Sequence, residues 1–207
     1  MNKMPELYPE LQPTLEEILG LPIAEDRKPA LQMVIDYIVK KGELQEPVRL
    51  NFICTHNSRR SQLSQIWAQV AAYSFEIDIE SFSGGVEETA FNERAVSALE
   101  TQGFRIRKEG TENPCYLVSF AQDTEPVLAF SKMYDDRINP STGFAAIMTC
   151  SDADENCPYI PGSEARIPLR YEDPKVFDGT AQASEKYLER SRQIASEMYY
   201  IFSRVAQ

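Results

Sequence analysis

Apolar residues follow one another along this chain in two alternating patterns, one typical of short strands and one typical of amphipathic helices. Residues 48–53 form a short apolar run that predicts a strand, and the helical spacing of apolar residues over 62–73 predicts a helix packed against it. Residues 75–82 alternate apolar and acidic side chains, which predicts a half-exposed strand that ends at a Ser-Gly-Gly break. A further helix is expected over 91–102.

The second half of the chain continues this alternation. Residues 114–134 contain two strand-like runs around a polar turn and predict a β-hairpin. Residues 144–150 are continuously apolar, as in a strand that is buried on both faces. The last helix is expected over about 181–205, with a buried face made of Tyr187, Ser191, Ile194, Met198, Ile201 and Phe202. Because strands and helices alternate nearly throughout, we predict one α/β domain over 47–207 with a mainly parallel sheet.

The first 46 residues predict a helical extension, which we call the arm (residues 1–46). Thr14 and Glu17 have the spacing of a capping box and predict a helix start. A second helix is expected from Pro29 to Lys41, with Gly42 as its end. The pattern is typical of a packing arm or of a contact between subunits.

The charge balance restricts the possible partners. There are 21 Lys and Arg residues against 32 Asp and Glu residues, so the formal net charge is −11. This charge argues against nucleic acid or an anionic membrane as the main partner, and any anion site must create its positive potential locally. No apolar run has the length of a membrane span, and the N-terminus lacks a signal-peptide pattern, so a cytoplasmic protein is expected.

The chain has four cysteines, Cys54, Cys115, Cys150 and Cys157. In a reducing compartment these thiols are expected to be free, catalytic or redox-active rather than to form structural disulfides. The spacing of the cysteines is not Cys-x2-Cys and the sole histidine is His56, so a zinc site is not favoured.

One loop between the first predicted strand and helix has the composition of an oxyanion site, and it reads Cys54-Thr55-His56-Asn57-Ser58-Arg59-Arg60-Ser61. Backbone N–H groups of such a loop and of the helix N-terminus can surround a tetrahedral anion, and the same dipoles favour the thiolate form of Cys54. Arg60 offers a planar fork for two anion oxygens. Ser61 can donate a hydrogen bond to the thiolate, and Asn57 tolerates the left-handed conformation that a tight loop needs.

Asp173-Pro174 is the second element with possible chemistry. A nucleophile that displaces an oxygen leaving group benefits from a positioned acid, and the proline stiffens the backbone beside the carboxylate. Ligands of parallel sheets bind beyond the carboxyl ends of the strands, where Cys54 is expected. We therefore predict that Asp173 joins the loop as a proton donor.

The loop CTHNSRRSQ, together with the later YEDP, resembles the low-molecular-weight protein-tyrosine phosphatase superfamily. The resemblance implies a four-stranded parallel sheet flanked by helices, from about residue 48 to the C-terminus, and leaves out residues 1–46 and the 114–134 insertion. It also implies that Cys54 is the nucleophile, that Arg60 binds the oxyanion and that Asp173 protonates the leaving group.

A later segment, TCSDADENCP, resembles the redox segment of thioredoxin-coupled arsenate reductases, which share this fold. The resemblance implies a relay in which Cys54 attacks arsenate, Cys150 attacks Cys54 with release of arsenite, and Cys157 then forms a disulfide with Cys150 that thioredoxin reduces. The acidic residues between the last two cysteines predict a segment that moves at little cost. Gln65 stands where these reductases usually have a glutamate that helps to hold potassium, and no bound metal or cofactor is expected.

Three functions remain open at this point. The first is an arsenate reductase that uses Cys54, Cys150 and Cys157. The second is a phosphatase that hydrolyses phosphotyrosine in a protein, or a small phosphate ester, through a Cys54 phosphoenzyme with Asp173 as the acid. The third is an oxyanion-binding module without turnover, and the presence of nucleophile, arginine and acid together argues against it. Cys115 matches nothing in these families and is expected to be structural.

Overall fold

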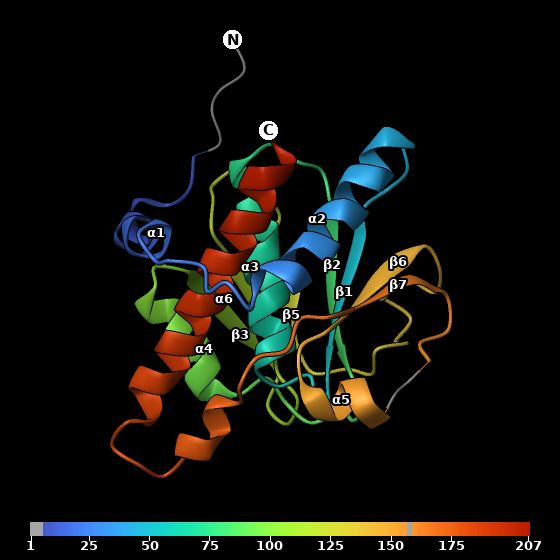
Figure 1. The fold of residues 1–207 in the computed structure, drawn as a ribbon. Helices are drawn as coiled ribbons and strands as arrows, with labels where there is room; N and C mark the ends of the chain where they lie inside the picture. Colours follow the sequence, from blue (N-terminus) through green and yellow to red (C-terminus); the bar gives the residue numbers. More distant parts are fainter. Residues whose placement is uncertain (1–5, 157–158) are drawn as a thin grey trace.

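The computed structural model describes residues 6–156 and 159–207. At its centre lies a four-stranded parallel sheet with the strand order β2-β1-β6-β7 (Figure 1). These strands are β1 (Arg49–Cys54), β2 (Glu80–Gly85), β6 (Phe144–Met148) and β7 (Ser163–Pro168). The prediction of an α/β fold with a parallel sheet is therefore confirmed.

Helices cover this sheet and complete its core. The helix α3 (Arg60–Ser74) packs on β1 and β2, and the helix α6 (Ala183–Val205) packs across α3. The larger hydrophobic cluster lies between them and includes Phe52, Trp67 and Tyr187. A smaller cluster contains Cys54 and Cys150 together with Ile53, Met148 and Ala153. The central strands are covered on both faces, which explains why their sequences are continuously apolar.

The arm is helical, as predicted, and packs against the C-terminal helix. It consists of the short 3-10 helix η1 (Pro9–Leu11), α1 (Gln12–Leu19) and α2 (Lys28–Glu43), and both α-helices contact α6. The expected capping box is wrong. Helix α1 begins before Thr14, and the Thr14 hydroxyl donates instead to the carbonyl of Gln102 at 3.0 Å, which joins the arm to the domain.

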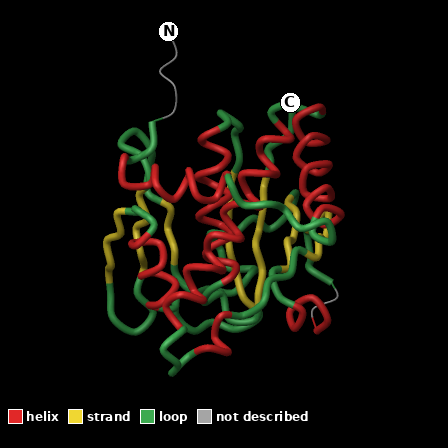
Figure 2. The backbone as a smooth tube through the Cα atoms, turned by 60° about the vertical axis from the view of Figure 1, so that its left-hand side comes forward, coloured by secondary structure: helices red, strands yellow, loops and turns green. Residues whose placement is uncertain are grey.

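A second, antiparallel sheet lies beside the first and contains the predicted hairpin. Its strands are β3 (Arg105–Glu109), β4 (Cys115–Ser119) and β5 (Val127–Ala129), in the order β3-β4-β5. The two groups of strands are separate in Figure 2. Strand β3 was not predicted because four of its five residues are charged and it is largely exposed, so it has almost no apolar pattern.

The predicted strand over 75–82 is wrong in position. Helix α3 continues to Ser74, and strand β2 begins only at Glu80 and runs through the two glycines that were expected to end it. A Cβ atom on Gly84 would lie 2.2 Å from the Cα atom of Tyr134, and one on Gly85 would lie 2.5 Å from the carbonyl oxygen of Glu87. The glycines therefore permit close packing at the end of the strand rather than a break in it.

The acidic segment after Cys150 is a helix rather than the loop that its composition suggested. This helix, α5 (Ser151–Asn156), lies at the carboxyl ends of β1 and β6 (Figure 1). The remaining elements are α4 (Glu93–Thr101) and the 3-10 helix η2 (Pro174–Phe177). Within the described ranges, none of the helices is both long enough and apolar enough to span a membrane.

Candidate active site

The oxyanion loop connects the last residue of β1, Cys54, with the first residue of α3, Arg60. Asn57 adopts φ 45° in the middle of the loop, the left-handed conformation that the sequence predicted. Its side-chain amide donates to Ser61 Oγ at 2.9 Å, and its Oδ1 accepts from the Lys132 backbone N–H at 3.1 Å. Asn57 therefore connects the loop to the helix behind it and to a distant segment.

The Cys54 sulfur lies in a largely buried position at the base of this loop, with 3% of the residue exposed. Its Sγ atom is 3.0 Å from Ser61 Oγ. Since Ser61 Oγ already accepts a hydrogen bond from Asn57, its own proton is available to the sulfur. The Cys54 sulfur can therefore accept a hydrogen bond from the Ser61 hydroxyl.

Both arginines of the loop contact the carboxylate of Asp173. Arg60 Nη2 lies 2.7 Å from Asp173 Oδ2, and Arg59 Nε lies 2.9 Å from Asp173 Oδ1. Arg60 Nη1 also donates to the Tyr171 carbonyl at 3.0 Å. The predicted acid and the predicted anion-binding arginine are therefore adjacent, and an anion entering the loop competes with Asp173 for the N–H groups of Arg60. The ion pair with Asp173 gives Arg59 a role that its position in the sequence did not reveal.

Cys150 lies beside the same loop. It follows β6 with 1% of its surface exposed, and its Sγ atom is 3.5 Å from the hydroxyl of Thr55 and 3.4 Å from the Ala153 nitrogen. Thr55 also donates to Asp152 Oδ2 at 2.8 Å. Cys54, Cys115 and Cys150 are free thiols. Cys157, the predicted third member of the relay, lies outside the described residues.

The other loop side chains make contacts with the segment 87–90. His56 Nε2 is 3.3 Å from a carboxylate oxygen of Glu87, and Ser58 Oγ donates to the Ala90 carbonyl at 2.6 Å. These contacts support the outer side of the loop. The side chains of His56 and Ser58 are therefore engaged there, and the oxyanion contacts predicted for this part of the loop would come from its backbone.

A segment that sequence reasoning missed holds the loop from behind, and we call it the strap (residues 130–132). The Phe130 carbonyl accepts from Gln62 Nε2 at 2.7 Å, and Ser131 Oγ donates to the His56 carbonyl at 2.8 Å. With the bond from Lys132 to Asn57, each of the three strap residues bonds to the loop or to the helix that follows it. The strap directly follows β5, so the antiparallel sheet is connected to the oxyanion loop. No local pattern in the sequence indicates contacts across about 75 positions.

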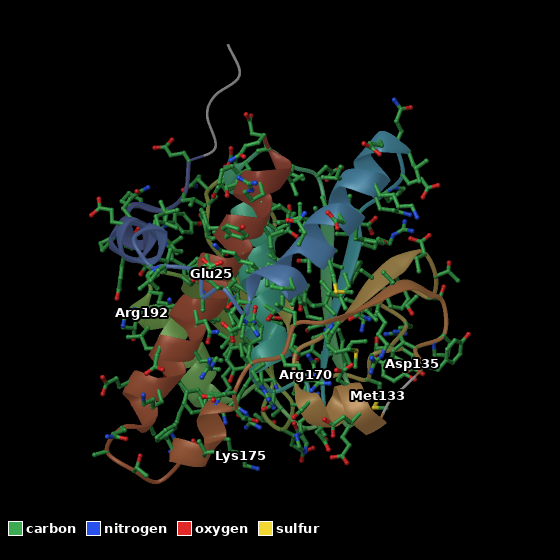
Figure 3. All side chains as sticks on the ribbon, viewed as in Figure 1. Glu25, Met133, Asp135, Arg170, Lys175 and Arg192 are labelled. Carbon is green, nitrogen blue, oxygen red and sulfur yellow. The ribbon has the colours of Figure 1, made fainter. Side chains whose placement is uncertain are left out.

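The helix α5 contacts the segment between β7 and η2, which we call the acid loop (residues 169–173), and this loop contacts the arm. Asp154 of α5 is buried, and its Oδ1 lies 2.5 Å from Arg166 Nη1 while its Oδ2 bonds to Arg170. Figure 3 shows Arg170 close to α5. The Arg170 carbonyl in turn accepts from Arg27 Nη1 of the arm at 2.7 Å. Among the described residues, His, Cys, Asp and Glu side chains form no group of three that could hold a metal ion.

Comparisons with known proteins agree with this geometry. No protein-family model matches the chain. The arsenate reductase of Staphylococcus aureus (strain Newman) is 27% identical over 124 residues, which are 59% of this chain and 76% of that protein. A low-molecular-weight phosphotyrosine phosphatase from Vibrio cholerae O395 has the same fold with a TM-score of 0.52, at 13% identity, over 76% of this chain and 95% of the phosphatase. The corresponding phosphatase from T. tengcongensis gives 0.50 at 16% identity, over 76% and 99% of the two chains.

The chain has the fold of the low-molecular-weight phosphatases. Its sequence is similar to that of the Staphylococcus arsenate reductase. About a quarter of the chain has no counterpart in the Vibrio phosphatase structure.

Proposed function

We propose that this protein reduces arsenate to arsenite through the thiolate of Cys54 and a relay of Cys150 and Cys157. The observation that carries the proposal is the position of Cys150, whose Sγ atom lies 3.5 Å from the hydroxyl of Thr55, the neighbour of Cys54. A phosphatase that resolves its intermediate with water has no use for a second buried thiol at this place. The similarity to the Staphylococcus arsenate reductase supports the same reaction.

In the first step, the Cys54 thiolate attacks the arsenic atom of arsenate and displaces one oxygen, which leaves as water after it receives a proton. Asp173 is the proposed source of that proton. In the structure its carboxylate contacts Arg59 and Arg60. An arsenate dianion that takes over the N–H groups of Arg60 would release Asp173 from this ion pair, and the carboxyl group can then hold a proton and donate it.

In the second step, the Cys150 thiolate attacks the sulfur of the Cys54–arsenic adduct. The electron pair of the S–As bond moves to arsenic, which is reduced from As(V) to As(III) and leaves as arsenite. The two sulfurs are oxidised to a Cys54–Cys150 disulfide. The attacking Cys150 thiolate must approach the Cys54 sulfur in line with the S–As bond that breaks. The step therefore requires Cys150 to lie beside the loop.

The third step restores the nucleophile. The Cys157 thiolate attacks Cys150, which releases the Cys54 thiolate and forms a Cys150–Cys157 disulfide. An external dithiol then reduces that bond, and thioredoxin is the proposed reductant. A disulfide needs the two Cα atoms within about 7 Å, and we propose that a shift or unwinding of α5 brings each pair to this distance during the relay. Such a cycle needs a reducing compartment, and we place the protein in the cytoplasm.

The proposal is tested with purified protein, thioredoxin, thioredoxin reductase and NADPH. Addition of arsenate should start NADPH consumption, and no consumption would contradict the proposal. The variant Cys150→Ser should lose multiple turnover while its Cys54 still reacts with arsenate. Cys115→Ser is the matched control, because Cys115 lies in β4 and has no part in the proposed relay, and this variant should turn over at the wild-type rate.

The alternative function is hydrolysis of phosphotyrosine or a small phosphate ester by the same loop. The observation in its favour is the complete set of Cys54, Arg60 and Asp173, which suffices for transfer of phosphate to sulfur and then to water. Hydrolysis of p-nitrophenyl phosphate measures it directly. If Cys150→Ser leaves a fast hydrolysis unchanged and arsenate starts no NADPH consumption in the wild type, the phosphatase function replaces the reductase function.

A further inference from the structure

A cavity on the far side of the strap contains a buried lysine that neither the proposed reaction nor the fold explains. The cavity has a volume of about 510 Å³ and lies between α3, β2 and the antiparallel sheet. This volume is within the range of small-molecule sites, which is about 300–1,000 Å³. The residues that matter for its chemistry are Gln65, Phe120, Thr124, Leu128, Lys132 and Asn139.

Lys132 is a cation in this cavity without a matching anion. The residue is 1% exposed, and its Nζ atom has one hydrogen-bond contact in the described part of the chain, with Ser83 Oγ at 3.4 Å. The Phe130 ring centroid lies 4.8 Å from Nζ. Ser83 already donates its proton to Gln65 Oε1 at 2.6 Å. The largest negative influence on the Lys132 ammonium is the charge of Asp136.

Burial of an ammonium group without a carboxylate partner costs free energy, because the charged form loses its hydration, and this loss lowers the pKa of the group. Loss of hydration lowers the pKa of Lys132 from 10.5 to about 8, against the opposing effects of Asp136 and Cys115. The amine is therefore still mostly protonated near neutral pH. An anion placed next to it would offset the lost hydration.

Two further polar atoms at the cavity have no hydrogen-bond partner in the described part of the chain. These are the hydroxyl oxygen of Thr124 and the side-chain oxygen of Asn139, both of which are buried. Such atoms are uncommon in folded proteins and indicate a site that a polar group can occupy. Of these two atoms only the Thr124 hydroxyl can donate to an anion, because the Asn139 oxygen is an acceptor.

The rest of the cavity lining is mixed, with Gln69, Ser81 and Glu125 among its polar residues and an apolar part on one side. Phe120 and Val127 form part of its wall, and Leu128 and Ile138 stand at its edge with 48% and 43% of their surfaces exposed. One ammonium group balances one negative charge, and a phosphate dianion would leave a second charge buried beside apolar walls. The chemistry therefore fits a monoanion with a hydrocarbon body.

We propose that this cavity binds a small organic carboxylate, with the carboxylate at Lys132 and an apolar body against Phe120, Leu128 and Ile138. The strap would carry the effect of binding to the active site. The Lys132 N–H bonds to Asn57, Asn57 bonds to Ser61, and Ser61 contacts the Cys54 sulfur. Occupancy of the cavity would thus hold the oxyanion loop in the conformation that the structure shows.

The test is calorimetric titration of the full chain with 3-phenylpropionate at pH 7, with its neutral amide, 3-phenylpropionamide, as the matched ligand. The carboxylate should bind at least tenfold more tightly than the amide. Lys132→Met should remove this preference, and Lys40→Met, an exposed lysine on α2, should retain it. Absence of binding to the wild-type chain, or equal binding of acid and amide, would overturn the proposal.

A second variant decides the outcome if Lys132→Met does not fold. Leu128 is exposed, so Leu128→Glu keeps the core intact while it places a negative charge at the edge of the cavity. It should weaken 3-phenylpropionate binding at least fivefold, and unchanged binding would sink the proposal. In the wild type, the ligand should also slow hydrogen exchange at the Lys132 amide. None of these measurements uses arsenate turnover, so they succeed or fail independently of the proposed reaction.

Discussion

The arm and the strap each bring a cation toward the catalytic domain, but only one of these two cations has a carboxylate partner among the described residues. Arg27 of the arm makes a bidentate contact with Glu197, in which its Nε and Nη2 atoms each lie 2.8 Å from a carboxylate oxygen. The Lys132 ammonium of the strap has one hydrogen-bond contact in the described part of the chain, the long one with Ser83. The ion pair of Arg27 joins the arm to α6, whereas the charge of Lys132 is not balanced by a carboxylate of the described residues.

The two regions also reach different halves of the active site. Arg27 donates to the Arg170 carbonyl and lies over the ring of Tyr171, with 4.8 Å between its guanidinium carbon and the ring centroid. The carbonyl of Tyr171 accepts from Arg60, and Asp173 follows two residues later. The arm therefore supports the acid loop, and the strap supports the oxyanion loop. Segments far from the oxyanion loop in the sequence thus take part in holding the active site.

The largest effect is expected from removal of the paired cation. Arg27→Ala leaves the buried Glu197 carboxylate without its ion-pair partner, and the expected loss of unfolding free energy is about 3 kcal/mol. The rate of arsenate reduction should fall as well, because the acid loop loses a contact. Urea unfolding measures the first effect. Lys28→Ala is the control, since its ion pair with Glu25 is exposed and its removal should not shift the midpoint. If Arg27→Ala and Lys28→Ala have the same urea midpoint and the same rate of arsenate reduction, the arm does not support the active site.

The unpaired cation should appear as a pH dependence of stability. The pKa of Lys132 falls from 10.5 in the unfolded chain to about 8 in the folded protein, so the unfolded state binds more protons between these values. Wild-type stability should therefore rise, relative to Lys132→Met, by about 3 kcal/mol from below pH 8 to above pH 10. Subtracting the unfolding free energy of Lys132→Met from that of the wild type at each pH removes most contributions of other titratable groups. A difference that does not change with pH would mean that Lys132 is hydrated or paired in solution.

The connection between strap and loop is tested at Asn57. Asn57→Gly keeps the positive φ but removes the bonds to Ser61 and Lys132, with an expected cost of about 2 kcal/mol in stability and about a tenfold lower arsenate reduction rate. Gln45→Gly is the matched control, because Gln45 also has a positive φ, 54°, and is exposed. If Asn57→Gly is as active as the wild type, the strap does not act through this residue.

The smallest effect is expected at Ser131. Its hydroxyl donates to the His56 carbonyl and accepts from the Thr89 N–H, both at 2.8 Å. Ser131→Ala should cost about 1 kcal/mol of unfolding free energy and raise the exchange rate of the Thr89 amide. Ser203→Ala on α6, which removes a hydroxyl far from the loop, should leave that exchange rate unchanged. An unchanged Thr89 exchange rate in Ser131→Ala would count against a supporting role for Ser131.

The pattern of apolar and polar residues along the chain predicted most of the central fold but placed some elements wrongly. The buried strand at 144–148 and the buried face of α6 follow from apolar runs and helical spacing, which depend on neighbouring residues only. The position of β2 was missed because Gly84 and Gly85 are typical of breaks, and their need for close packing against Tyr134 and Glu87 arises from distant segments. The helix α5 was missed because its acidic sequence has almost no apolar residues apart from Ala153.

By itself, the sequence determined the chemistry that the protein can perform. The order Cys54, Asn57, Arg60 and Ser61 between a strand and a helix predicts a loop with a reactive sulfur, since the pattern lies within eight consecutive residues. Only the tertiary structure decided what holds and surrounds that loop. The ion pair of Arg59 with Asp173, the contact of the arm with the acid loop and the unpaired charge of Lys132 join residues far apart in the chain. Such contacts are fixed by burial and packing of the whole domain, which no local pattern encodes.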